Sequence, residues 1–233
     1  MVRIKGLLII SFIFGFFAGP AFGIANPTVM IDTSDGLFQK TYSEGEIQVL
    51  PNDTYFLEDQ ASNGVFEAAW NLTFKSDPYA VSWVSIRNTT GTSQIYTVTF
   101  IEPVSPTIGP SSIYGGSVGG SLTTDALGGY VSTVPPESLY LGMIDGIGIL
   151  SFYPHPSSLS RPNGGTTMID LQETWGLVDG PVNSGISIQH KFELGPGDAL
   201  ALSGYFQVEP VPEPATLFLL AAGAAVVLRR RSR

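Results

Sequence analysis

The sequence contains no cysteine, which excludes disulfide bonds, thiolate metal sites and cysteine nucleophiles. Charged residues are also few, at 13% of the 233 residues, whereas hydrophobic residues make up 43%. A chain with this balance can bury a core, so extended disorder is not expected. Its length allows one ordinary domain together with processing segments. The 27 glycines and 17 prolines favour many turns and short strands over long helices.

Basic residues are scarce outside the two ends of the chain. Residues 24–211 contain 19 acidic and five basic residues, a net charge of −14, and the other six basic residues lie at the termini. Such a domain would be repelled by the phosphate backbone of nucleic acids and by anionic lipid. We therefore expect no nucleic-acid partner. The acidity suits a soluble extracellular protein or one that meets cations.

The N-terminus has the order of a secretory signal peptide. Residues 1–5 are short and basic, residues 7–18 form an almost unbroken apolar run, and Gly19-Pro20 ends that run. The run is too short for a comfortable membrane span. We predict a helical signal peptide over residues 1–25 that directs the chain to the Sec translocon. Signal peptidase is expected to cleave near the small residues Ala21, Gly23 and Ala25.

The C-terminus combines three features in order. A Pro-Glu-Pro motif is followed by an apolar stretch over residues 215–228 and then by a group of arginines. Proline keeps the backbone extended ahead of the stretch, and the stretch can insert into a bilayer as a helix. Arginine resists translocation and would stay in the cytoplasm. The motif is Pro212, Glu213 and Pro214, and the basic cluster is Arg229, Arg230, Arg231 and Arg233.

This ending resembles the PEP-CTERM sorting signal of bacteria that often produce exopolysaccharide. The resemblance implies that residues 210–233 are recognised by an exosortase, an integral-membrane cysteine protease that removes the tail during surface delivery. The 14 apolar residues would span about 21 Å as a helix, against a bilayer core of roughly 30 Å. This shortness favours transient membrane insertion and removal, and a permanently membrane-anchored surface protein is the alternative.

Residues 26–209 alternate between apolar and polar side chains with a period of two, which is typical of half-buried antiparallel strands. The clearest runs span residues 66–74, 79–83, 95–101, 186–194 and 200–208. Residues 88–92 are expected to form a hairpin loop, and segments 113–130 and 154–165 to form long surface loops. The pattern predicts an all-β extracellular domain. We expect an antiparallel β-sandwich, Ig-like or jelly-roll, flanked by the signal peptide helix and a C-terminal hydrophobic helix.

One serine matches a hydrolase motif. The segment 115–119 fits the pattern G-x-S-x-G around Ser117, and Asp145 or Asp170 followed by His190 would complete the order of a catalytic triad. That motif needs a strand before the serine and a helix after it, and no helical pattern follows Ser117. His190 also falls on the apolar face of its expected strand. We therefore assign no catalytic residue and expect no enzyme, with a secreted hydrolase of glycan or ester substrates as the alternative.

Candidate metal ligands are few. The chain has two histidines and no cysteine, so a zinc site at His155 would need carboxylates to complete it. Oxygen-rich turns suit calcium, but no EF-hand loop pattern is present, and solubilising charge explains the acidic turns. We expect no cofactor, with calcium as the exception to be tested. The acidic turns contain Asp32, Asp35, Asn52, Asp53, Glu58 and Asp59.

The three tryptophans divide into two groups. Trp70 and Trp83 lie in clear strand patterns and are expected in the core, whereas Trp175 lies outside these strands. An exposed tryptophan can stack on a sugar ring, so Trp175 is a candidate glycan contact. Together these observations predict an exported, non-enzymatic surface or extracellular-matrix protein. We expect it to be sorted by an exosortase-like system and associated with exopolysaccharide.

Overall fold

A computed structural model describes residues 26–75, 78–104, 107–109 and 111–211. These described residues form fifteen β-strands and one short 3₁₀ turn, Glu44–Glu46 (η1), with no α-helix among them. The prediction of an all-β class is confirmed. The expected signal helix within residues 1–25 and the apolar helix over residues 215–228 lie outside the described residues. In the ranges that are described, no helix is long and apolar enough to cross a membrane.

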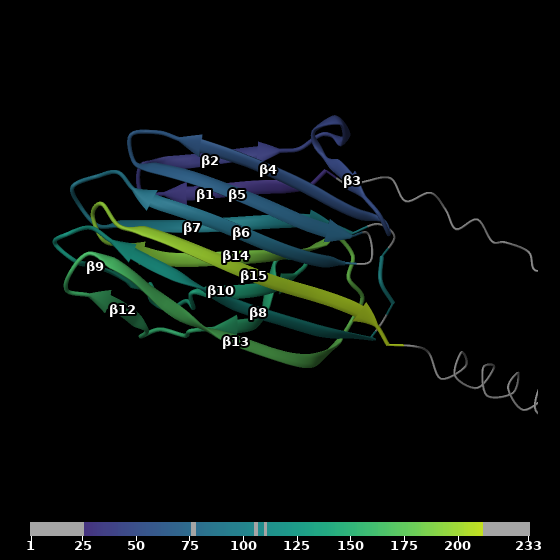
Figure 1. Cartoon of the computed structure of the whole chain (residues 1–233). Coiled ribbons are helices and arrows are strands. Elements are labelled where there is room, and N and C mark those ends of the chain that lie inside the picture. Colours follow the sequence, from purple (N-terminus) through teal and green to yellow (C-terminus); the bar gives the residue numbers. More distant parts are fainter. Residues whose placement is uncertain (1–25, 76–77, 105–106, 110, 212–233) are drawn as a thin grey trace, which may run out of the picture.

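The strands form two antiparallel sheets that lie face to face (Figure 1). Sheet A has the order β11-β10-β14-β7-β1-β2, with β9 pairing to both β14 and β12. Its strands are β1 (Thr28–Thr33), β2 (Gly36–Thr41), β7 (Gln94–Pro103), β9 (Gly129–Ser132), β10 (Tyr140–Ile144), β11 (Ile147–Phe152), β12 (Ser158–Arg161) and β14 (Gly185–Leu194). Sheet B has the order β13-β8-β15-β6-β5-β4-β3. Its strands are β3 (Gln48–Leu50), β4 (Thr54–Ser62), β5 (Phe66–Lys75), β6 (Tyr79–Asn88), β8 (Ser111–Thr124), β13 (Gly165–Asp179) and β15 (Ala199–Pro210).

A single hydrophobic core lies between the sheets. Burial alternates along β5, where every second residue from Phe66 to Phe74 is buried, because successive side chains of a strand point to opposite faces. The two inner faces also touch through polar atoms. The hydroxyl of Tyr140 in sheet A donates a 2.6 Å hydrogen bond to the carbonyl oxygen of Tyr205 in sheet B. Burial raises the pKa of Tyr140 far above its usual range.

Strand β6 turns its large side chains outward. Trp83 is half-buried rather than in the core, whereas Ala80 and Val84 are buried. The reason is the register with β5, which places Val84 opposite Trp70, a core residue that is 2% exposed. Residues directly opposite in an antiparallel pair share a face. The prediction that Trp70 is a core residue is therefore confirmed, and the same prediction for Trp83 is wrong.

The glycine-rich segment expected as a loop is a central strand. Strand β8 pairs with β13 on one side and β15 on the other. Its glycines allow close approach: a Cβ added at Gly120 would lie 2.2 Å from the carbonyl oxygen of Ala201 in β15. The prediction of long loops over 113–130 and 154–165 is thus wrong for most of β8 and for β12, because the glycines serve packing between strands rather than a turn.

The last strands of the chain complete both sheets. Successive strands β13, β14 and β15 alternate between sheet B, sheet A and sheet B. Strand β14 inserts between β7 and β10, and β15 inserts between β6 and β8. The first residue of β1 and the last residue of β15 lie at the same end of the molecule (Figure 1). We call this the tail end.

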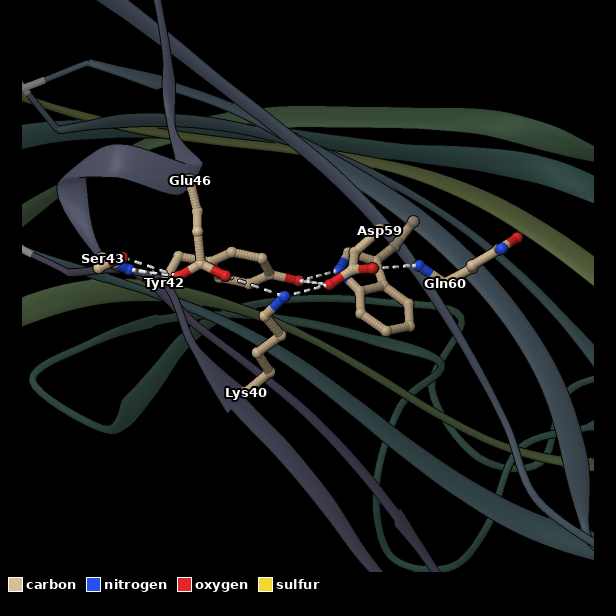
Figure 2. Close-up of polar contacts among 7 residues, drawn as sticks. Lys40, Tyr42, Ser43, Glu46, Asp59 and Gln60 are labelled. Atoms are coloured by element: carbon tan, nitrogen blue, oxygen red, sulfur yellow. Dashed lines mark hydrogen bonds and ion pairs between the residues drawn. The ribbon is translucent and has the colours of Figure 1, made fainter.

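A polar network joins the two sheets by linking Lys40 of β2 to Asp59 of β4 (Figure 2). The Lys40 ammonium lies 2.7 Å from Asp59 and 3.1 Å from Glu46. The Tyr42 hydroxyl donates to Asp59 at 3.1 Å and accepts a 2.8 Å hydrogen bond from the indole N–H of Trp70. The core tryptophan is thereby linked through Tyr42 to a surface ion pair.

The network shifts the pKa values of its members. Hydrogen bonds from the backbone and hydroxyl of Ser43, and then from Lys40, lower the pKa of Glu46 to about 2. Burial by itself would raise the pKa of Asp59, but hydrogen bonds from Lys40, the Gln60 N–H and Tyr42 outweigh it and lower the pKa. Asp59 is therefore a carboxylate engaged by Lys40 and Tyr42.

Candidate functional site

The face of sheet B that points away from the core carries a row of aromatic side chains. The strand registers place Trp175 of β13, Gly115 of β8, Gln207 of β15 and Tyr79 of β6 side by side. Tyr205 lies two residues before Gln207 on the same face of β15. We call Trp175, Tyr205 and Tyr79 the aromatic strip. It crosses four neighbouring strands.

The rings of the aromatic strip contact one another edge to face. The ring centres of Trp175 and Tyr205 are 6.3 Å apart with an interplanar angle of 61°, and those of Tyr205 and Tyr79 are 5.5 Å apart at 66°. The Lys75 ammonium lies 5.5 Å from the centre of the Tyr79 ring. Trp175 is 58% exposed, and both tyrosines are half-buried. Each ring therefore keeps part of its surface free for a ligand.

Small residues line the surface beside the strip. A Cβ added at Gly115 would lie 2.2 Å from the Trp175 ring, so the indole rests directly on the backbone of β8. Ser117 and Gly119 occupy the next outward positions of β8, and Ser203 lies opposite Gly119 on β15. Any larger side chain at Gly115 would lift the indole off the sheet.

Polar groups border the strip on β15. The Tyr205 hydroxyl donates to the side-chain oxygen of Gln207, and the Gln207 amide donates to Glu209. Burial, with Tyr79 and Glu209 nearby, raises the pKa of Tyr205 to about 12, so its hydroxyl stays protonated at neutral pH. The strip thus combines apolar ring surface with hydroxyl, amide and carboxylate groups.

The far half of the same face is hollowed. A hollow of about 640 Å³ lies over β4, β5 and β6, floored by small residues such as Ala69 and Ser85. Glu67 and Arg87 also line it, with 3.8 Å between their charged groups. Trp83 lies two residues before Ser85 on β6 and separates the hollow from the strip.

The sequence identified one member of the aromatic strip. Trp175 is exposed, as a glycan contact must be, but it belongs to β13 instead of lying outside the strands. Tyr79 and Tyr205 were missed, and Trp83, which lies beside the strip, was expected in the core. A signal for two of them was present, because Tyr79 and Trp83 alternate with the small residues Ala80 and Ser82, which leaves the large side chains on one face.

The residues of the hydrolase motif do not come together. Ser117 lies on the outer face of sheet B opposite Tyr205, whereas His190 is fully buried between the sheets. The His190 Nε2 lies 3.5 Å from the Ser82 hydroxyl, and its ring lies edge-on to Tyr140 and Phe100. Burial lowers the pKa of His190 to about 3. The expectation that His190 lies on the apolar face of its strand is confirmed.

The two aspartates considered for the triad have other surroundings. Asp145 accepts backbone hydrogen bonds from Asn183, Ser184 and Gly185 at the turn between β10 and β11. Burial opposes its ionisation, but these bonds outweigh it and hold the pKa of Asp145 well below its usual range. Asp170 lies at an irregularity in the pairing of β13 with β8. Neither is placed to orient His190.

The candidate metal ligands are also dispersed. His155 is exposed, with its Nδ1 3.2 Å from the carbonyl oxygen of Thr133. Asp32 lies on β1, whereas Asn52 and Asp53 form the turn between β3 and β4. Within the part of the chain that the structure describes, no group of three histidine or acidic side chains could hold a metal ion. The expectation of no cofactor, with calcium as the exception to be tested, stays a prediction.

The sorting motif begins where the fold ends. Strand β15 ends at Pro210, and the Val211 N–H donates a 3.0 Å hydrogen bond to the Ser111 carbonyl of β8. The proline motif follows at the next residue. The motif residues, the arginine cluster and the signal cleavage region at Ala21, Gly23 and Ala25 lie outside the described residues.

Comparison with protein-family models supports the interpretation of the tail. The PEP-CTERM protein-sorting motif matches residues 210–232. No curated protein matches the chain. The motif implies that the chain is an exported protein, sorted by an exosortase to the cell envelope or surface. It covers the tail alone, so the activity of the two-sheet domain must be argued from its own surface.

Proposed function

We propose that this protein is a non-enzymatic surface or matrix protein that binds polysaccharide through the outer face of sheet B. The observation that carries the proposal is the aromatic strip. Pyranose rings have an apolar face of C–H groups that packs on aromatic rings, and their hydroxyls pair with amide and carboxylate groups. Trp175 and Tyr205 supply the rings, and Gln207 and Glu209 supply the polar groups.

The charge of the domain limits the kinds of polysaccharide that it can bind. With a net charge of −14 over residues 24–211, the domain repels polymers rich in carboxylate, sulfate or phosphate. The strip lies open on the outer face of sheet B, unlike a closed pocket, which would enclose a single sugar. We therefore propose an uncharged polysaccharide that lies along the strip as an extended chain.

The positions of Ser117 and His190 argue against hydrolysis, and the length of the apolar stretch argues against permanent anchoring. Ser117 and His190 lie on different sides of sheet B, so His190 cannot act as the base for Ser117. The apolar stretch of 14 residues spans about 21 Å as a helix, less than the roughly 30 Å of a bilayer core. We propose that signal peptidase and an exosortase remove both ends, and that the released domain associates with exopolysaccharide.

We also propose a jelly-roll topology for the sandwich. Sheet B contains the consecutive order β6-β15-β8-β13, and sheet A contains β7-β14-β10-β11. Successive strands alternate between these sheets except at β10 and β11, which pair as a hairpin. This double winding is that of an eight-stranded jelly roll. The strands β1–β5 extend its two sheets on one side.

Binding to polysaccharide tests the function. The protein secreted by its host is mixed with purified host exopolysaccharide and with neutral and acidic polymers, and affinity is measured by electrophoresis in polymer-containing gels. Trp175→Ala should weaken binding about tenfold, or about 1.4 kcal/mol. Leu37→Ala, an equally exposed residue (54%) on β2, is the control. Equal retention of both variants by a polymer, or no retention of the wild-type protein, would refute the proposed function.

A further inference from the structure

Strand β15 holds the chain in the middle of sheet B up to the residue before the sorting motif. Val208 donates to the Pro78 carbonyl at 2.9 Å on the β6 side, and Val211 donates to the Ser111 carbonyl at 3.0 Å on the β8 side. The Pro-Glu-Pro motif starts at the next residue, Pro212. In the folded protein no free residue therefore separates the sheet from the motif.

The membrane lies close to the same point while the tail is inserted. Four peptide units separate Val211 from Ala215, where the apolar stretch begins, and these reach at most about 14 Å. The polar headgroup layer occupies roughly 5–8 Å of that length. The tail end of the folded domain consequently stands against the membrane surface during sorting.

A protease must take its substrate as an extended segment on both sides of the bond that it cuts. Such a segment pairs its backbone with the enzyme, as a peptide does when it adds to a sheet edge. Residues 209–211 cannot pair with β8 and with a protease at the same time. We infer that the exosortase reaches the motif only after these last residues of β15 leave sheet B.

The residues at the end of β15 allow the release to stay confined to residues 209–211. Glu209, Pro210 and Val211 are all exposed, whereas Val208 is 1% exposed. Proline has no N–H and contributes no donor to the sheet. Release of residues 209–211 therefore draws no core side chain of β15 out of the sandwich, whereas release that reached Val208 would. Fraying of this kind is common at strand ends with few buried contacts. The three residues form a releasable segment that lengthens the accessible chain by about 10 Å.

A spacer inserted into the full-length chain tests this inference. Six Gly/Ser residues between Val211 and Pro212 supply free chain without release of β15, so the tail should be removed several-fold faster in a pulse–chase experiment in the native host. The same spacer between Ala126 and Leu127 is the matched control, because Leu127 is 89% exposed in the turn between β8 and β9.

The outcomes separate this step from the sorting that it presupposes. Faster removal with the spacer at the tail and an unchanged rate with the control spacer support the inference. Equal rates for all variants would overturn it, because the protease would then act on the folded domain or before folding. A wild-type tail that is never removed would overturn the proposed removal of the tail by an exosortase, and this inference with it.

Discussion

Replacement of His190 by leucine should remove most of the pH dependence of stability between pH 8 and pH 5. His190 is fully buried among Phe100, Tyr140 and Ser82, and no group among the described residues hydrogen-bonds to its Nδ1. Burial lowers its pKa from 6.5 to about 3. The folded protein therefore keeps the ring neutral, while the unfolded chain takes up a proton below pH 6.5.

The sign and size of the effect follow from this difference. A group that binds a proton only in the unfolded state stabilises the unfolded state, so stability is full above pH 6.5 and falls as the pH is lowered toward 3. The loss is about 1.4 kcal/mol per pH unit once the unfolded histidine is protonated, which gives about 2 kcal/mol at pH 5. His190→Leu has no such proton to bind. When the pH falls from 8 to 5, its free energy of unfolding should therefore decrease by about 2 kcal/mol less than that of the wild type.

Urea unfolding of residues 26–211, followed by tryptophan fluorescence, measures the difference. This segment contains every strand of both sheets. The wild type, His190→Leu and the exposed-site control His155→Leu are compared at pH 8, 7, 6 and 5. The control should follow the wild type. Parallel pH profiles for the wild type and His190→Leu would refute the burial argument, since no buried neutral histidine would then contribute.

Two further substitutions test the packing and the polar network. Gly120→Ala places a Cβ 2.2 Å from the Ala201 carbonyl oxygen and should cost about 1–3 kcal/mol, whereas Gly91→Ala, with open space around it, should leave the thermal midpoint unchanged. Equal midpoints would contradict the close pairing of β8 with β15. Tyr42→Phe leaves the buried indole N–H of Trp70 without its 2.8 Å acceptor and should lower the free energy of unfolding by about 1–3 kcal/mol in urea titration. No loss would show that this hydrogen bond contributes nothing.

The strand class could be predicted because it depends on local alternation. Inward residues such as Trp70 and Leu72 recur with period two in the sequence, and the structure confirms their burial. Which of the two alternating sets of residues in a strand faces the core is harder to predict. In β6 both alternating sets contain apolar residues, so register with β5 decides which set is inside, and that pairing is not visible in a single sequence.

The glycine-rich strand β8 could not be recognised for a related reason. Glycine is depleted in strands in general, so four glycines within residues 115–120 favour a loop. Their actual role depends on what lies beside them: Trp175 covers Gly115, and Ala201 closely approaches Gly120. Both neighbours are more than 50 residues away in sequence. The aromatic strip was missed for the same reason, because Trp175, Tyr205 and Tyr79 meet only through the pairings of β8 and β15.

Strand β15 links the two proposed roles of the chain. It carries Tyr205 and Gln207 of the candidate glycan face, and it continues directly into the sorting motif. Gln207 lies four residues before Val211, which is roughly 13 Å along a strand. In the sorting step that we propose, the inserted tail would bring the row of Trp175, Gln207 and Tyr79 close to the membrane surface, where a long polymer has least room. Removal of the tail would then free that end of the face. Processing would then determine both where the protein resides and how fully its binding surface is open to polysaccharide.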